Sequence, residues 1–281
     1  MAVITMEMVK KLREETHAGI MDCKKALSQA DGDFAAAAKY LKEVGLAAVE
    51  KRADRATEEG RITFAIGEKM AVIVNVTCET DFVARNAEFK KLGEEICALA
   101  LQKGCKEATE EMEDLVKGLI ATIHENMAIK GYAAFDVPAN GYVSGYSHAD
   151  GNIGVLVSFE ASDKKVFENE AFKTLAFNTA MHVCAADPLY LDAQSVPKAY
   201  EEEQLSIFRV QVANMGKPEK VLEGIVKGKL NKHYADICLM NQVCQVYNDD
   251  GLTVAQLLAK FNKENGTDVK ITGFQRMRAG A

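Results

Sequence analysis

The sequence predicts an α+β protein with an N-terminal three-helix module, a duplicated α+β core with antiparallel sheets, and an inserted antiparallel helical hairpin. Three observations predict this class. Amphipathic helical patterns interrupted by glycines fill the first 45 residues. A pattern of two alternating strands followed by a helix then occurs twice along the chain. Two amphipathic helices joined by a Gly-Lys-Pro turn are inserted in the second copy. The predicted boundaries are 1–55 for the module and its linker, 56–140 for the first copy, 141–281 for the second copy, and about 195–235 for the hairpin.

The N-terminal module is expected to contain three short helices. Thr5 can cap the first helix, and Gly19 is expected to end it. The second helix is expected to stop near Gly32. Asp33 can cap the third, whose apolar stripe runs to Gly45, where the helix is expected to end. So small a bundle is marginally stable alone, so we expect it to pack against the rest of the chain or a partner.

The first copy follows a charged segment, residues 47–60, which is expected to be a helical linker. A β-hairpin with its turn at 67–69 is predicted by two sets of alternating apolar residues. These residues are Ile62, Phe64 and Ile66 in one strand and Val72, Val74 and Val76 in the other. Apolar residues at three- and four-residue steps predict helices over 87–102 and 110–127.

The second copy repeats this order. Strands are expected at 142–148 and 153–159, joined by a tight turn at 149–152 that contains Asp-Gly. A last strand is expected at 269–274. The helical hairpin between them is equally compatible with an internal core element and with a projecting arm that binds a partner.

The two copies are similar in sequence as well as in pattern. Residues 71–92 align with 154–175 without a gap, and seven of the 22 aligned positions are identical. Ordinary composition would give roughly one or two identities. The identical pairs are Val72/Val155, Val74/Val157, Val83/Val166, Asn86/Asn169, Phe89/Phe172, Lys90/Lys173 and Leu92/Leu175. An internal duplication explains them.

Composition and charge exclude several classes of function. The chain has 281 residues, a formal net charge of −7 and no clustered run of Lys and Arg, which argues against a direct nucleic acid partner. It has no apolar run long enough to span a membrane, and its first residues lack a signal-peptide pattern, so a cytoplasmic location is expected. Seven cysteines without a C-x-x-C pair predict reduced, buried thiols, and no metal or cofactor is expected.

Enzymatic chemistry has little support in the sequence. Motifs for a nucleophilic serine, a phosphate-binding loop and a zinc protease are all missing. His182 and Cys184 lie close together in sequence, but residues two apart on a helix point in different directions. His182 is therefore interpreted as a core histidine, and we predict that the protein is not an enzyme. A cysteine-dependent enzyme remains the alternative, and it would need a thiol with a lowered pKa.

The duplicated copies differ where the second strand leads into the helix. Thr80, Asp81 and Phe82 align with the sequence Asp-Lys-Lys at 163–165. The fold therefore does not require this loop sequence. Phe82 is either tucked under the following helix or presented to a partner, since exposed aromatic residues are typical interface hot spots.

Two segments resemble the characteristic regions of the translation elongation factor Ts family. They are Leu12–Leu27, with the sequence LREETHAGIMDCKKAL, and Thr77–Asn86, with the sequence TCETDFVARN. Further similarity runs along the chain at 125–127, 153–157, 180–183, 216–218 and 253–258. The resemblance implies a module similar to ubiquitin-associated domains and a guanine nucleotide exchange factor whose partner is elongation factor Tu.

The resemblance also implies which residues bind the partner. The element that releases GDP would be Thr80, Asp81, Phe82 and Val83, of which the Asp-Phe pair enters the GTPase near its nucleotide-bound magnesium. The other implied contacts are Arg13, Ile20, Met21, Ile123, His124 and His148. The chain departs from the family at His17 and His124, where glycine is common, and at Lys130-Gly131, where a basic pair is common. A heterotetramer with the partner and a homodimer are both compatible with this function. A general adaptor that binds only through its N-terminal bundle is a further alternative, but it leaves Asp81 and Phe82 without a role.

Overall fold

The computed structural model describes residues 3–16, 18–50, 52–246 and 250–280. Their contacts divide the chain into two compact units. The first consists of Met1–Phe135, Ser147–Gly154 and Met277–Ala281, and the second of Asp136–Tyr146 and Val155–Arg276. No helix in the described ranges is both long and apolar enough to cross a membrane. His17, which the sequence resemblance singled out, lies outside the described residues.

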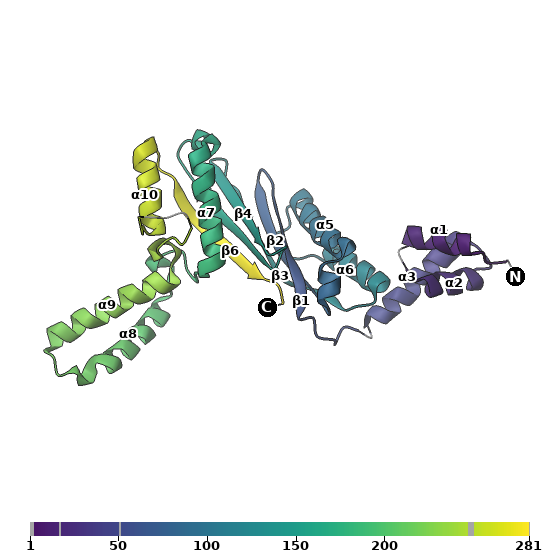
Figure 1. The fold of residues 1–281 in the computed structure, drawn as a ribbon, viewed down its shortest axis with the longest axis horizontal. Coiled ribbons are helices and arrows are strands. Elements are labelled where there is room, and N and C mark those ends of the chain that lie inside the picture. The colour runs from purple at the N-terminus through teal and green to yellow at the C-terminus, as the bar shows by residue number, and fades with distance from the viewer. Residues whose placement is uncertain (1–2, 17, 51, 247–249, 281) are drawn as a thin grey trace. The chain divides into compact units, whose positions relative to one another are not determined.

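The N-terminal module contains the three expected helices, drawn in purple in Figure 1: α1 (Met6–Thr16), α2 (Ile20–Gln29) and α3 (Phe34–Glu50). The Thr5 hydroxyl accepts a hydrogen bond from the Met8 N–H at 3.3 Å, so the predicted cap of α1 is confirmed. The helices enclose a small apolar core of their own. Its fully buried members are Val9, Leu12, Cys23, Ala26, Leu27 and Ala37.

Two glycines of this module do not end helices as predicted. Gly19 directly precedes α2 with φ −60° and ψ 146°, so it is the N-cap of α2 and not the end of α1. Gly45 lies inside α3, where a Cβ would collide with the Cβ of Ala121 on α6 (Glu110–Ile123). Glycine therefore allows two helices to approach closely there. The helix α3 extends into the expected helical linker, 47–60, as far as Glu50, but residues 52–58 are not helical and a strand begins at Glu59.

The first sheet has the strand order β1-β2-β3, formed by β1 (Glu59–Ile66), β2 (Met70–Cys78) and β3 (Met127–Asp136). The predicted hairpin is confirmed, with β1 and β2 paired antiparallel. The sequence did not predict β3, since a helix was expected to reach residue 127. Helix α5 (Ala87–Lys103) and α6 pack beside this sheet (Figure 1). Their shared core includes Val72, Val74, Val76, Phe89, Leu92, Ile96 and Val116.

The second sheet repeats this arrangement with the order β4-β5-β6. Its strands are β4 (Gly141–His148), β5 (Ile153–Glu160) and β6 (Lys270–Arg278), and it is antiparallel like the first. The last strand is longer than expected from the sequence. Helices α7 (Glu170–Ala186) and α10 (Val254–Asn265) supply the apolar cover. An aromatic cluster fills the core and consists of Tyr142, Phe159, Phe167, Phe172 and Phe261.

Identical residues of the two copies occupy equivalent structural positions. The side chains of Asn86 and Asn169 each cap the following helix by accepting a hydrogen bond, at 2.8 Å, from the backbone N–H two residues on. Phe89 and Phe172 lie one turn into these helices and are 1% and 0% exposed. These two identical pairs therefore mark residues that the repeated scaffold needs.

Helices α8 (Lys198–Val212) and α9 (Glu219–Ile237) form an antiparallel pair (Figure 1). The connection between them contains Gly216, whose φ of 64° suits glycine. Near the base of the pair, the hydroxyl of Tyr200 and Nε2 of His233 are 3.0 Å apart. This aromatic contact joins the two helices.

His182 on α7 is a core residue, as the sequence predicted. Its side chain is fully buried, its Nε2 lies 3.0 Å from Oε1 of Gln242, and its Nδ1 accepts the N–H of Gln245 at 3.2 Å. Burial lowers the pKa of this imidazole below its ordinary value of 6.5, although the bond to Gln242 opposes the shift. The neutral ring therefore fixes the segment that follows α9.

A pH dependence of stability follows from His182. Because its pKa is lowered in the folded state, its contribution to stability is complete above the unfolded pKa of about 6.5 and is lost as the pH falls through the folded value. We expect the urea-denaturation midpoint to fall when the pH is lowered from about 7 to about 5. In His182→Gln, which has no group to titrate there, the fall should be smaller. An equal fall in both proteins would assign the pH dependence to other groups.

Candidate functional site

The segment between β2 and α5 projects one aromatic side chain from an anchored base. Thr80 precedes the short helix α4 (Asp81–Ala84), and its hydroxyl accepts the Val83 N–H at 3.4 Å. Val83 is 7% exposed and belongs to the core of the first sheet, whereas Phe82 is 83% exposed. Of the two alternatives left by the sequence, the tucked position is therefore wrong. Phe82 is presented at the surface.

Asp81 lies beside Phe82 in an electrostatically mixed environment. Its carboxylate is 3.1 Å from the guanidinium of Arg85, whose side chain is 76% exposed, while that of Asp81 is 45% exposed. Ion pairs of this kind contribute little to stability and exchange readily with solvent. A groove of about 150 Å³ adjoins the pair, lined also by β1 and by the 149–152 turn. Asp81 is therefore accessible to a partner.

The turn at this groove is held firmly to the first unit. Asp150 contacts Arg61 at 2.9 Å and Lys90 at 2.7 Å, and these hydrogen bonds hold the pKa of its carboxyl well below the usual range. The Ile62 N–H also donates to the Gly151 carbonyl at 2.7 Å. His148, an implied partner contact, ends β4 at this turn and is exposed.

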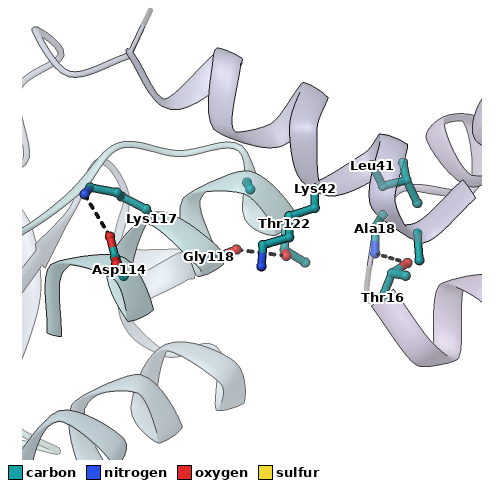
Figure 2. A pocket seen from close by; sticks show the side chains of 10 residues that line it. Thr16, Ala18, Leu41, Lys42, Asp114, Lys117, Gly118 and Thr122 are labelled. Carbon is teal, nitrogen blue, oxygen red and sulfur yellow. Dashed lines mark hydrogen bonds and ion pairs between the residues drawn. The ribbon is translucent and has the colours of Figure 1, made fainter. Parts of the chain in front are cut away.

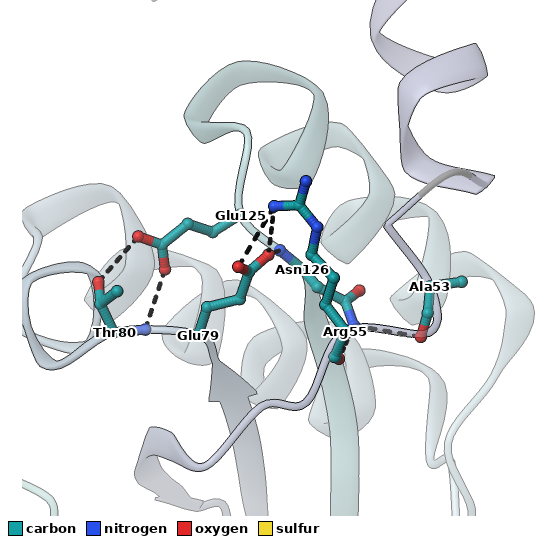
Figure 3. Close-up of polar contacts among 6 residues, drawn as sticks. All are labelled: Ala53, Arg55, Glu79, Thr80, Glu125 and Asn126. Atoms are coloured by element: carbon teal, nitrogen blue, oxygen red, sulfur yellow. Dashed lines mark hydrogen bonds and ion pairs between the residues drawn. The ribbon is translucent and has the colours of Figure 1, made fainter.

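A polar network fixes the base of the projecting segment (Figure 3). The N–H and hydroxyl of Thr80 donate to the two carboxylate oxygens of Glu125 at 3.1 and 2.8 Å. The carboxylate of Glu79 accepts the Asn126 N–H at 2.6 Å and contacts Arg55 at 3.3 Å. The sequence predicted Thr80 as part of the release element, but it did not identify Glu79, Glu125 or Asn126 as functional, because their partners lie far apart in the chain and no short motif joins them.

The remaining implied contacts lie on the N-terminal module and at the end of α6. Arg13 is exposed on α1, while Ile20 and Met21 are 46% and 74% exposed at the start of α2. Ile123 is half-buried against the core of the first sheet. Nε2 of His124 lies 3.6 Å from Oδ2 of Asp22, next to Met21. The end of α6 and the start of α2 therefore form one group of candidate contacts.

A cavity of about 570 Å³ lies between the N-terminal bundle and α6 (Figure 2). Several polar groups in its lining are paired with near neighbours. Lys117 contacts Asp114 at 2.9 Å, and the hydroxyl of Thr122 donates to the Gly118 carbonyl at 3.2 Å. The drawn polar contacts thus join neighbours within α6 or within the bundle and do not converge on one point. The cavity contributes no implied partner contact.

His124 occupies a backbone conformation that glycine adopts without strain. It ends α6 with φ 68° and ψ 22°, in the left-handed region. A side chain with a Cβ costs about 1 kcal/mol or more there. Glycine would thus be favoured at this position for a conformational reason, independent of any partner.

We expect His124→Gly to raise the free energy of unfolding by about 1 kcal/mol, because it removes this strain. The measurement is a urea titration followed by circular dichroism. His124→Ala is the control, since it removes the imidazole but keeps the Cβ, and it should give no gain. A loss of stability in both variants would show that the contact with Asp22 outweighs the strain.

The cysteines do not support the alternative of a thiol enzyme. No disulfide joins them within the described residues. Burial raises the pKa of Cys78 to about 12 and also raises the pKa of Cys184, the cysteine nearest His182 in sequence. Reactive thiols have lowered pKa values. In the described part of the chain, no group of His, Cys, Asp and Glu is arranged to hold a metal ion.

Comparisons with known proteins point to one family. The family model described as elongation factor TS matches residues 79–281. Elongation factor Ts of Treponema denticola is 42% identical over 264 residues, covering 94% of this chain and 94% of that protein. Elongation factor Ts of Borreliella burgdorferi is 40% identical over 281 residues and covers 100% of both chains. That of Clostridium acetobutylicum is 38% identical over 291 residues, covering 99% of this chain and 93% of the relative.

Proposed function

The chain belongs to the elongation factor Ts family, and we propose that it is the guanine nucleotide exchange factor of elongation factor Tu, which promotes GDP release during translation elongation. The observation that carries the mechanism is the 83% exposure of Phe82 on a segment anchored by buried Val83. An aromatic side chain held out from a rigid base can enter a partner without refolding. The family acts by binding, so no covalent bond is formed or broken.

The exchange step follows from how a GTPase holds GDP. Backbone amides contact the phosphates, and magnesium offsets their charge. We propose that Phe82 and Asp81 enter near this magnesium, where the ring acts as a wedge and the carboxylate disturbs the metal site. Asp81 can leave Arg85 at small cost because the Arg85 side chain is largely exposed and that of Asp81 is about half exposed. Accelerating release about 10⁴-fold requires roughly 5.5 kcal/mol of differential stabilisation.

Two further surfaces are proposed to bind the same partner. One comprises exposed Arg13, Ile20 and Met21 together with the end of α6, Ile123 and His124. The other is His148 at the turn that Asp150 fixes. Several contacts around the intruding segment would supply the binding energy that displacement of the nucleotide requires. As a factor of translation, the protein would act in the cytoplasm.

The test is stopped-flow release of a fluorescent GDP analogue from elongation factor Tu, with and without this protein. We expect the release rate to rise with protein concentration to a plateau. Binding without faster release would favour the general adaptor instead. Light scattering of the purified complex then separates a heterodimer from a heterotetramer.

A further inference from the structure

Two carboxylates link the segment that carries Asp81 and Phe82 to the residues just before β3. Glu125 binds Thr80, and Glu79 binds Asn126. We propose that Glu79 and Glu125 are positioning residues, which hold the segment Thr80–Val83, here called the exchange segment, in its projecting geometry before the partner binds. This inference rests on the proposed function. It assigns a role to two residues that do not themselves project toward the partner.

Glu125 fixes the first residue of the exchange segment. Its two oxygens accept both hydrogen bonds that Thr80 can donate, from the backbone N–H at 3.1 Å and from the hydroxyl at 2.8 Å (Figure 3). Bonds to a charged acceptor are roughly twice as strong as neutral ones. Because the same Thr80 hydroxyl also accepts the Val83 N–H, Glu125 orients the turn from which Phe82 projects.

Glu79 makes the reverse connection. Its Oε1 accepts the N–H of Asn126, the residue after Glu125, at 2.6 Å, and Arg55 contacts both its oxygens at 3.3 Å. The Asn126 side chain in turn donates to the carbonyl of Arg55 at 2.7 Å and of Ala53 at 3.3 Å. Asn126 is 7% exposed, so its polar groups are shielded from water and costly to leave unpaired, whereas the side chains of Glu79 and Arg55 are 21% and 53% exposed. The network joins the exchange segment to the chain that leads in from the N-terminal module.

The second copy of the core provides an internal comparison. There the N–H of Ser162 donates to the carboxylate of Asp268 at 2.8 Å, and its hydroxyl bonds the other oxygen. Asp268 precedes β6 as Glu125 precedes β3, in each case by two residues. In both copies, a carboxylate before the third strand of the sheet thus binds a residue that follows the second strand. In the alignment of the copies, this residue lies one position earlier in the second copy (Ser162) than in the first (Thr80).

The first copy has a second carboxylate at this point, that of Glu79, and the second copy does not. Glu79 aligns with Ser162, which has no carboxylate to offer a reverse contact. The chain after β2, which both Glu79 and Glu125 hold, therefore leads into Asp81 and Phe82. The chain after β5, which Asp268 holds, leads into Asp-Lys-Lys at 163–165. This asymmetry favours positioning of the exchange segment over general stabilisation of the fold. Pre-organisation of this kind removes an ordering cost from the binding step.

The positioning can be measured without the partner. The chain has no tryptophan, so Phe82→Trp introduces a single fluorescent reporter on the exchange segment. In this background we expect Glu125→Gln and Glu79→Gln to increase the amplitude of fast depolarisation in time-resolved anisotropy. Asp268→Asn is the matched control, since it removes the same kind of contact from the second copy. It should leave the motion of the tryptophan unchanged.

The consequence for exchange is measured with the native Phe82. We expect Glu125→Gln and Glu79→Gln each to lower the maximal rate of GDP release about 10-fold, the scale of ordering one or two side chains. Asp268→Asn should change the maximal rate of GDP release less than about twofold, although the melting temperature of this variant should fall as much as that of Glu125→Gln. Circular dichroism confirms that each variant is folded.

Two results would overturn the proposal. One is unchanged depolarisation of the tryptophan in both carboxylate variants. The other is an equal slowing of release by Asp268→Asn, which would show that slower release reflects a general loss of stability and not a loss of positioning. If Phe82→Ala leaves release unchanged, the proposed role of Phe82 in exchange fails by itself, and the anisotropy experiment still decides whether the two carboxylates order the segment.

Discussion

Phe82→Ala is expected to slow the maximal rate of GDP release from elongation factor Tu about 30-fold or more. Truncating an aromatic hot spot typically costs about 2 kcal/mol or more, which corresponds to this factor in rate. The melting temperature should hardly change, because the side chain is 83% exposed and packs little in the free protein. Stopped-flow release of a fluorescent GDP analogue measures the rate, and circular dichroism measures the melting temperature.

The duplication supplies a matched control for this variant. Lys165 occupies the position of Phe82 in the second copy and is likewise exposed, so Lys165→Ala should leave release unchanged. Asp81→Ala should slow release through the same contact as Phe82→Ala. The double variant should therefore lose less than the sum of the two single effects. A fall of many degrees in the melting temperature of Phe82→Ala would instead make Phe82 a structural residue.

The sequence predicted elements best where apolar residues recur with a clear period, including β2, which is buried along its whole length. The hairpin of β1 and β2 and the helix α5 show clear periodicity, and both are present. Strand β3 was missed because its sequence, MAIKGYAAFD, is rich in alanine and lacks alternation. Its residues between the ends are mostly half-buried, so no polar face contrasts with an apolar one. At Gly131, an added Cβ would lie 3.2 Å from the Cβ of Asn75, so close packing favours the small residue.

Glycine was ambiguous in the N-terminal module for a related reason. A glycine can end a helix through a left-handed conformation, or it can admit a neighbouring element, and sequence does not separate the two. Gly32, with φ 88°, follows α2 as predicted, whereas Gly45 admits Ala121 of another helix. The role of Gly45 is therefore explained by a contact between helices and not by the local sequence.

The candidate site was predictable only in part. Comparison of the two copies isolated Phe82 as a residue that the scaffold does not require, but only the structure showed that it is exposed. The supporting carboxylate of Glu125 could not be found this way. Glu125 stands outside the aligned repeat, and its contact with Thr80 depends on β3, the strand that the periodicity did not reveal.

The largest expected effect is thermodynamic. If this protein weakens the affinity of elongation factor Tu for GDP, then GDP must weaken the affinity for this protein by the same factor, because coupling between two ligands is reciprocal. For a coupling of roughly 5.5 kcal/mol, the factor is about 10⁴. Titration calorimetry with nucleotide-free and with GDP-loaded elongation factor Tu measures both affinities. Equal affinities would exclude the exchange mechanism, however tightly the proteins bind.

The same titrations can locate the coupling within the molecule. An interaction that favours binding equally in both nucleotide states lowers both dissociation constants and leaves their ratio unchanged. Removing the exposed side chains of Ile20 or Met21 should therefore weaken binding in both states if the N-terminal module serves only as an anchor. Phe82→Ala should instead weaken binding mainly to nucleotide-free elongation factor Tu, because its contact competes with bound GDP and magnesium. The ratio of the two affinities should then fall about 30-fold, by the same factor as the rate of release. A ratio that stays unchanged in Phe82→Ala would place the coupling elsewhere on the surface, even if release becomes slower.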